Sequence, residues 1–386
     1  MWRALASNAL TVLVVGLFLM GGLILWGQSR YTSAGPLETA ICLQVKGGSN
    51  MTKVSQQLED QGAISSSIIF RMAADYTDKA QKLKAGSFLV REKASMEHII
   101  DEITSSGAST CGSEIEYRVG VTRIQTRVRE LDPATLDFNE IASFEASAEE
   151  VPAAYTEKRN NADTRYRLSV AEGVTSWQVV EALKGIDALK GDVTEIPAEG
   201  LLAPDSYDVI PGDDRNAILQ KMQDKQQLRI NAVWEGRQDG LPISSPEEML
   251  ILASIIEKET GVPQERGQVA SVFVNRLERG MKLQTDPTVI YGVTKGQGVL
   301  GRGLRRSELR RATPWNTYVI DGLPPTPIAN PGLASLEAAV APEDTSFVFF
   351  VADGTGGHAF AETLQEHNRN VAKWREIEAE QKSSGN

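Results

Sequence analysis

Two glutamates at the end of an apolar stretch could carry out acid–base chemistry. Glu257 and Glu259 directly follow Met249–Ile256, a run that is apolar almost all round and therefore predicts a buried helix. Gly261 then marks a typical helix end. A carboxylate in the last turn of a buried helix faces the negative end of the helix dipole and loses solvation. Both effects raise the pKa of a carboxyl group, as a general acid working near neutral pH requires.

The start of this helix is also encoded in the sequence. Ser245 can cap it, Pro246 suits its first turn, and Glu248 completes an S-x-x-E capping box. The helix is therefore expected to begin at this serine.

The two glutamates lie on different faces of the predicted helix. Glu257 shares its face with Leu250 and with the small residues Ala253 and Ser254, which leave space for a cleft. Glu259 lies on a bulkier face with less room for a substrate. The alternative is that both carboxylates are solvated residues at a fraying helix end.

Length and charge limit the functional class. The chain has 386 residues, enough for two or three domains, and its 41% hydrophobic and 24% charged residues are typical of a globular protein. A net charge of −11 argues against broad nucleic-acid binding, which needs a basic face.

A membrane anchor is predicted near the N-terminus. Residues 9–27 contain no charge and, as a helix, span about 29 Å, close to the thickness of a bilayer core. Trp26 and Tyr31 suit the membrane interface. The short segment 1–8 is expected to be cytoplasmic, which places everything after the single span in the periplasm of a bacterium. A cleaved signal peptide is the alternative.

The two cysteines, Cys42 and Cys111, could pair in an oxidising compartment. They flank one compact predicted unit. Two buried free thiols are the alternative.

Alternating and helical patterns predict an α+β protein. Ala40–Lys46 and Leu83–Arg91 have strand character, and Met51–Gln61 and Ser66–Tyr76 between them have helix character. This strand–helix–helix–strand order resembles a LysM-type glycan-binding module. A partial repeat follows, in which four residues recur 125 positions later: Val45, Gly48, Val54 and Leu58 return as Val170, Gly173, Val179 and Leu183.

Two other regions are expected to be irregular. Asp132–Asp163 has few large apolar residues, which predicts an elaborate connection. After residue 281 the chain is rich in Gly and Pro, which predicts loops and short strands, with Phe347–Ala352 as a buried strand.

Several other functions are disfavoured by their motifs. Gly296, Gly298 and Gly301 match G-x-G-x-x-G, but no strand precedes them, which argues against a dinucleotide site. His358 and His367 lie near acidic residues (Glu362 and Glu366), yet H-E-x-x-H is absent, so no metal is expected. Neither a nucleophile elbow nor a P-loop occurs.

The ordered segments of the C-terminal half resemble one family. LASIIEKET, VASVFVNRL, LQTDPTVIYG, GLPPTPIANPGLASLEAAVAP and GGHAFAETLQEHN, in this order, are similar to the MltG-type endolytic murein transglycosylases. EGLLAPDSY matches with departures: Ala203 stands where an aromatic is usual and Ser206 where Thr is usual. These departures put a substrate contact in doubt, not the chemistry.

The resemblance implies that Glu257, the first glutamate of E-K-E-T, is the catalytic acid and base. The implied reaction cleaves the β-1,4 bond between N-acetylmuramic acid and N-acetylglucosamine without water and leaves a 1,6-anhydro end. No cofactor is implied. The family is also anchored in the inner membrane by one N-terminal helix.

Other polar and aromatic residues on predicted loops could contact sugars by hydrogen bonding or stacking. These candidates are Gln284, Asp286, Tyr291, Asn316 and Tyr318. The alternative is that Asp286 caps a turn and that Tyr291 belongs to the core.

Together these patterns predict a cytoplasmic tail, a transmembrane anchor, a LysM-like module, a connecting subdomain and a mixed α/β catalytic domain with a buried catalytic helix. Their residues are 1–8, 9–27, 38–115, 116–198 and 199–380. The predicted partners are peptidoglycan glycan strands, the inner membrane through residues 9–27 and, by family function, peptidoglycan synthases, with no nucleic acid. Two other functions stay open: a non-catalytic peptidoglycan-binding scaffold and a lysozyme-like hydrolase.

Overall fold

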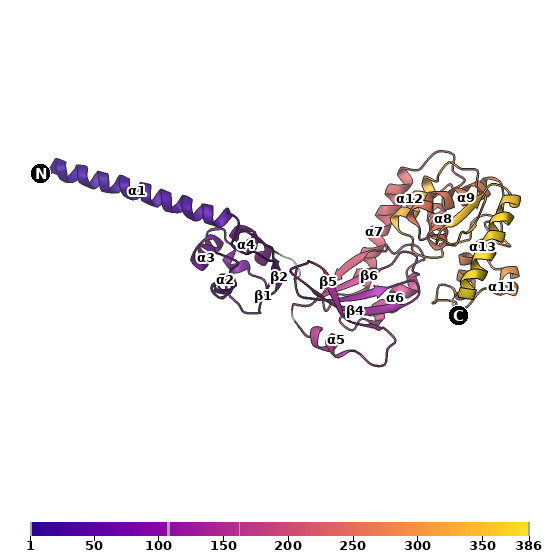
Figure 1. The fold of residues 1–386 in the computed structure, drawn as a ribbon, viewed down its shortest axis with the longest axis horizontal. Helices are drawn as coiled ribbons and strands as arrows, with labels where there is room; N and C mark the ends of the chain where they lie inside the picture. Colours follow the sequence, from indigo (N-terminus) through magenta and orange to yellow (C-terminus); the bar gives the residue numbers. More distant parts are fainter. Residues whose placement is uncertain (1, 106–108, 162, 385–386) are drawn as a thin grey trace. The chain divides into compact units, whose positions relative to one another are not determined.

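The computed structural model describes residues 2–105, 109–161 and 163–384 (Figure 1). The chain begins with one long helix, α1 (Trp2–Thr32). Its segment Thr11–Thr32 is 22 residues long and apolar enough to cross a membrane, and none of it is buried within the protein. At 1.5 Å per residue this segment is about 33 Å long, which matches a bilayer core.

The chain forms two compact units, which are described separately. The first contains the residues up to Glu116 together with Arg127–Phe144 and Glu149–Tyr166, and the second contains Tyr117–Thr126, Glu145–Ala148 and the chain from Arg167 onward.

The predicted strand–helix–helix–strand order in the first unit is confirmed. Its elements are β1 (Ile41–Val45), α2 (Met51–Asp60), α3 (Ser67–Tyr76) and β2 (Gly86–Val90), followed by α4 (Met96–Thr104). The strands pair antiparallel, with Ile41 opposite Val90. Leu43, Leu58, Phe70 and Ile100 are fully buried in the core that these elements enclose.

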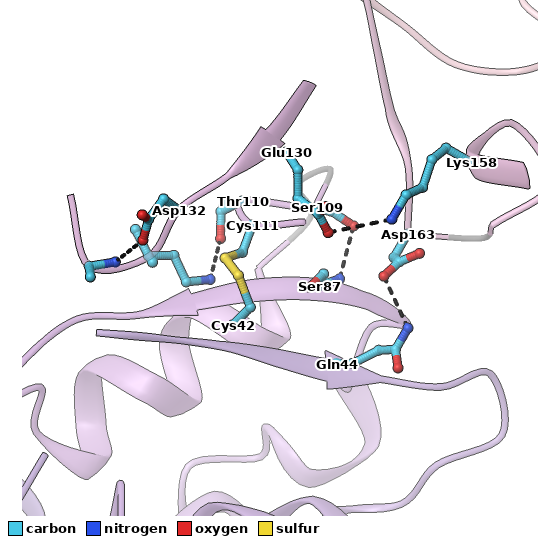
Figure 2. The surroundings of a disulfide bond; sticks show 12 residues. Cys42, Gln44, Ser87, Ser109, Thr110, Cys111, Glu130, Asp132, Lys158 and Asp163 are labelled. Atoms are coloured by element: carbon cyan, nitrogen blue, oxygen red, sulfur yellow. Dashed lines mark hydrogen bonds and ion pairs between the residues drawn. A yellow bond between two sulfur atoms is a disulfide. The ribbon is translucent and has the colours of Figure 1, made fainter. Parts of the chain in front are cut away.

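Cys42 and Cys111 form a disulfide inside the first unit, so the pairing alternative is the one observed (Figure 2). Their Cα atoms are 5.6 Å apart. The segment that carries Cys111 runs beside β2, since the backbone N–H of Cys111 donates to the carbonyl of Ser87 at 3.0 Å. The Thr110 hydroxyl accepts from the N–H of Leu89 at 2.9 Å.

A five-stranded sheet corrects the prediction of an irregular connection over residues 132–163. The strand order is β5-β4-β3-β6-β7. The strands are β3 (Ser113–Val119), β4 (Ile124–Leu131), β5 (Phe138–Glu145), β6 (Arg165–Val170) and β7 (Ser206–Val209). β5 and the short helix α5 (Ala153–Lys158) occupy the stretch expected to be irregular.

One strand-to-helix turn recurs along the chain. In the predicted repeat, β1 and β6 end at valine, Gly48 and Gly173 follow with φ of 77° each, and Asn50 and Thr175 cap the next helix. The helix after β6 is α6 (Ser176–Gly185). β2 and β7 also end at valine, and in each case the third residue after the strand has a left-handed backbone. This residue is Lys93 after β2 and Gly212 after β7. The repeat is therefore a local structure used four times.

The second unit is built around packed helices. These are α7 (Arg215–Glu235), α8 (Pro246–Glu259), α9 (Arg266–Glu278), α10 (Asp286–Thr294), α11 (Arg306–Arg310), α12 (Leu333–Val340) and the terminal α13 (Leu364–Ser384). A hairpin of β8 (Phe349–Ala352) and β9 (His358–Ala361) completes it. The expectation of loops and short strands after residue 281 is wrong where α10, α11 and α12 lie, whereas the terminal helix expected over 363–380 is confirmed by α13. The Ala-rich α12 packs on α8 within one hydrophobic core.

Candidate active site

Helix α8 forms as its sequence predicts. The Ser245 hydroxyl accepts from the N–H of Glu248 at 3.2 Å, and Pro246 occupies the first turn. In a capping box, the Glu248 side chain would accept a hydrogen bond from the N–H of the cap residue, Ser245. Here it accepts from the N–H of the preceding residue, Ser244, at 2.6 Å. All residues from Met249 to Ile256 are buried.

Glu257 follows this buried run and is half-buried. Its Oε2 accepts a hydrogen bond from the backbone N–H of Gly332 at 3.0 Å. Among the described residues, no hydrogen bond reaches the other oxygen, Oε1. One oxygen is therefore held by the main chain while the other is available to exchange a proton.

The small residues below Glu257 do not open a cleft, which corrects that part of the helix-face argument. Ala253 and Ser254 are fully buried. The Ser254 hydroxyl donates to the Ile251 carbonyl at 2.7 Å and accepts from the N–H of Ile328 at 3.0 Å. The small side chains instead let the segment around Ile328 approach the helix.

Lys258 ties helix α8 to the turn after β6. Its Nζ donates to the carbonyl of Gly173 at 3.1 Å. Burial lowers the pKa of Lys258, and the negative charges of Glu257 and Glu199 oppose that effect. A half-buried cation is thus influenced by two carboxylates.

Glu199 is a site residue that sequence reasoning missed. Its Oε1 accepts from the N–H of Ser176 at 2.7 Å and from Asn330 Nδ2 at 3.5 Å. Burial raises the pKa of Glu199, and the hydrogen bonds from Ser176 and Tyr291 oppose that rise only in part. The available signal was its position at the head of EGLLAPDSY, where it precedes Gly200.

Tyr291 lies on the same side of the site as Glu199. It hydrogen-bonds Glu199, and burial raises its own pKa. The ring centroids of Tyr291 and Trp315 are 5.8 Å apart. Lys295 also contacts Trp315, with its Nζ 3.5 Å from the centroid of the Trp315 ring. These side chains form an aromatic surface that carries one exposed cation.

Asp286, Tyr318 and Glu259 form a separate group. The Tyr318 hydroxyl donates to Asp286 Oδ1 at 2.7 Å, and burial raises the pKa of Tyr318. Glu259 accepts a hydrogen bond from the Thr285 hydroxyl. Burial raises the pKa of Glu259, with a further contribution from the charge of Asp286. Glu259 thus holds α8 to the start of α10.

Gln284 and Asn316 differ in availability. Gln284 is exposed, has a φ of 48°, and its N–H donates to the Thr317 carbonyl at 3.1 Å. Asn316 is fully buried, and its amide donates to the backbone carbonyls of Glu308, Leu309 and Arg311 and accepts from the N–H of Tyr318. The Asn316 amide therefore organises the loop before Tyr318.

The histidines considered as metal ligands have other partners. The ring nitrogen Nδ1 of His358 lies 2.9 Å from Glu265 Oε2. The backbone N–H of His358 donates to the other oxygen, Glu265 Oε1, at 2.9 Å. The ring of His367 stacks on Phe349, with centroids 5.1 Å apart.

The structure is that of a mixed α/β protein with a half-buried carboxyl group, that of Glu257, at the end of one buried helix. The chain belongs to the YceG-like family, which it matches over residues 43–373.

Two relatives carry the same name. The chain is 28% identical, over 92% of its own length and 91% of the relative, to an endolytic murein transglycosylase of Bacillus subtilis strain 168. It is 26% identical, over 84% of its length, to an endolytic murein transglycosylase of Streptococcus pneumoniae strain D39, of which it spans 57%. A crystal structure of a yceG-like protein from Listeria monocytogenes aligns with 86% of this chain and 99% of that one, with 24% identity and a TM-score of 0.45.

Proposed function

We propose that this protein is an endolytic murein transglycosylase and that Glu257 is its catalytic acid and base. The observation that carries the proposal is the state of the Glu257 carboxyl group: Oε2 is fixed by the Gly332 N–H at 3.0 Å, and Oε1 accepts no hydrogen bond from any residue that the structure describes. The names of the relatives give the substrate class, peptidoglycan.

The proposed reaction uses one carboxyl group twice. Glu257 donates its proton to the leaving oxygen of the bond between N-acetylmuramic acid and N-acetylglucosamine. The carboxylate then takes the proton of the muramic C6 hydroxyl, whose oxygen bonds to the anomeric carbon and closes the 1,6-anhydro ring. The C6 hydroxyl belongs to the same sugar, so its attack is intramolecular and can outrun that of water.

The groups around Glu257 support binding of a sugar chain. We propose that Tyr291 and its neighbour Trp315 form a stacking surface for the glycan chain and that Gln284, Asp286 and Tyr318 form hydrogen bonds with the same chain. Asn316 contributes by holding the backbone that carries Tyr318.

The remaining parts position this chemistry in the cell. Helix α1 is proposed to be a single inner-membrane span, with the rest of the chain in the periplasm. The disulfide between Cys42 and Cys111 supports an oxidising compartment. Residues 38–115 are proposed to be a LysM-like glycan-binding module, 116–198 a connecting subdomain and 199–380 the catalytic domain. Such an enzyme would act on nascent strands, terminate their elongation and work beside peptidoglycan synthases.

A lysozyme-like hydrolase is the second candidate, because a second carboxylate, Glu172, lies near Glu257. A hydrolase of that kind uses two carboxyl groups, one as acid and one as base or nucleophile.

Mass spectrometry of the products separates these functions. The full-length protein in detergent is incubated with purified peptidoglycan, and the released fragments are weighed. A 1,6-anhydromuramic end supports the proposal, and a reducing end, heavier by one water, supports a hydrolase. Absence of cleavage, with the protein still pelleting on sacculi, would mean a non-catalytic scaffold.

A further inference from the structure

A strongly basic segment, residues 295–311, begins at the aromatic surface of the site. It holds six cations and a single acidic residue, in a chain whose net charge is −11. The cations are Lys295, Arg302, Arg305, Arg306, Arg310 and Arg311. Such a concentration of positive charge on one short segment of an acidic protein indicates a surface that receives an anionic ligand.

The start of the basic segment is fixed to the site. Lys295 is the cation on the aromatic surface of Tyr291 and Trp315. A Cβ built on the next residue, Gly296, would lie 3.1 Å from both Glu199 and Tyr291. Gly296 also has a φ of 74°, so the turn and the close approach both require glycine. The basic segment therefore leaves the aromatic surface at a defined position.

The end of the basic segment is fixed to the same site by Asn316. The Asn316 amide donates to the backbone carbonyls of Glu308, Leu309 and Arg311, which lie at the end of α11. Its Oδ1 accepts from the backbone N–H of Tyr318 at 3.0 Å. One fully buried side chain thus connects α11 to Tyr318, a residue proposed to contact the sugar chain.

Most of these cations have no acidic partner in the part of the chain that the structure describes. Glu308 is the sole acidic residue between Asp286 and Asp321. Arg302 pairs with it through both terminal nitrogens, at 2.9 and 2.6 Å, and the N–H of Arg305 donates to the same carboxyl group. The other cations are exposed and without such a partner: Lys295, Arg306, Arg310 and Arg311. Their charge is therefore available to a ligand.

The proposed substrate carries suitable negative charges beside its sugars. In peptidoglycan, a short peptide extends from the lactyl group of N-acetylmuramic acid, and its free carboxyl groups are ionised at neutral pH. We infer that the basic segment binds these peptide carboxylates while the glycan chain lies on the aromatic surface of Tyr291 and Trp315. The inference rests on the proposed function and deepens it, since it assigns the substrate class: glycan strands that still bear their peptides. A guanidinium group suits this role because its planar N–H donors match a carboxylate.

The size of the effect depends on several charges acting together. One exposed ion pair contributes little, because water and salt screen it. Arg306, Arg310 and Arg311 lie on one short helix and the residue after it, so they can act on one multiply charged peptide. Removing all three charges is expected to weaken binding about tenfold.

The first test compares strands with and without their peptides. Full-length protein in detergent is incubated with soluble uncrosslinked glycan strands, either intact or freed of peptides by an amidase, and 1,6-anhydro ends are counted to obtain kcat/KM. The wild type is expected to favour the intact strands. The triple variant Arg306→Gln, Arg310→Gln and Arg311→Gln should lower the ratio of the two kcat/KM values about tenfold, through KM. The same three positions changed to Lys keep their charge and should retain most of the ratio.

A matched control removes the same charge elsewhere in the second unit. Lys184→Gln, Lys221→Gln and Arg237→Gln together change exposed positions outside the site and should keep the wild-type ratio. Equal kcat/KM of the wild type on both kinds of strand would overturn the inference. An equal fall of the ratio in the control would overturn it as well, because the effect would then come from net charge alone.

A binding measurement tests the inference without turnover. The full-length proteins are pelleted with insoluble peptidoglycan, either intact or freed of peptides, and Kd is obtained from the unbound fraction. Kd for intact peptidoglycan should rise about tenfold in the triple Gln variant. An unchanged Kd would overturn the inference, whatever products the wild type forms. A wild type that forms no anhydro ends on either strand would refute the proposed function instead.

Discussion

Glu257 accepts a hydrogen bond from the backbone N–H of Gly332, with 3.0 Å between Oε2 and the nitrogen. A main-chain donor cannot rotate away as a side chain can, so this bond fixes the carboxyl plane at the end of α8. The donor lies just before α12, which packs on α8 in the same core. The orientation of the Glu257 carboxyl group thus depends on the packing of two helices.

The first prediction concerns Glu259 and pH. Burial raises the pKa of Glu259 in the folded state above its unfolded value of about 4.3. Between these two values the folded protein binds more protons than the unfolded chain, so its stability falls as pH rises through that window. Glu259→Gln removes this dependence. As pH rises from about 4, the wild type should lose stability through this group and the variant should not. The difference between their melting temperatures, variant minus wild type, should therefore increase and then level off. A constant difference would show that the carboxyl titrates equally in both states.

The second prediction separates a structural role of Asn316 from a substrate contact. Asn316→Ala leaves several buried backbone groups without their partners and should lower the free energy of unfolding by about 2–4 kcal/mol. Gln284→Ala, at an exposed side chain, should change stability little and weaken substrate binding. Urea unfolding and kcat/KM measure the two effects. A stable Asn316→Ala variant with impaired activity would return Asn316 to the substrate contacts.

The third prediction concerns the approach of residue 200 to α8. Gly200 has a φ of 88°, and a Cβ there would lie 2.9 Å from Pro327 and 3.1 Å from Leu250. Gly200→Ala combines backbone strain with overpacking and should cost about 2–4 kcal/mol of stability. Gly185→Ala, at a helical position with open space around it, is the matched control and should not destabilise the protein. Equal stability of both variants would mean that the chain relaxes freely at residue 200.

The fourth prediction concerns the disulfide. Cys42 and Cys111 are 69 residues apart, and a closed loop of that length stabilises the folded state by about 4 kcal/mol in the chain-entropy description. Replacing both cysteines by serine should lower the denaturant midpoint of the first unit by a corresponding amount. Alkylation of the wild-type protein without reductant, followed by mass spectrometry, should label neither cysteine. Two labelled thiols would contradict the observed pairing.

Local patterns in the sequence were sufficient to predict α8, its cap and the repeated strand–turn–helix. Each of these depends on neighbours within a few residues: the serine cap, the apolar run, and a left-handed residue three positions after the strand. The position of Glu257 followed from the same helix.

The long-range part of the fold was not predictable in this way. Glu114 is fully buried on β3 and paired with Arg129 and Arg165, which lie on other strands. In sequence such charges indicate solvent, and only the distant partners make their burial possible. Of the strands in this sheet, only β5 lies in the stretch expected to be irregular, Asp132–Asp163, which has few large apolar residues to indicate a strand.

Glu172 and Glu199 were missed for the same reason. Each lies beside an informative glycine, Gly173 or Gly200, yet their proximity to the end of α8 arises from contacts between distant segments. The small residues of α8 led to an error of another kind, because they indicated a cleft that the structure does not have. A segment near Ile328, 74 residues beyond Ser254, fills that space.

The central claim is that Glu257 performs the chemistry, and anhydro-muramic ends measure it most directly. Purified peptidoglycan is digested with wild type, Glu257→Gln and Glu259→Gln at equal concentration, and the 1,6-anhydro ends are counted by mass spectrometry. General acid catalysis contributes about 10²–10⁴-fold, so Glu257→Gln should yield at least a hundredfold fewer ends while melting like the wild type. Glu259→Gln should retain most activity. A folded Glu257→Gln protein that still produces anhydro ends at the wild-type rate would contradict the assignment.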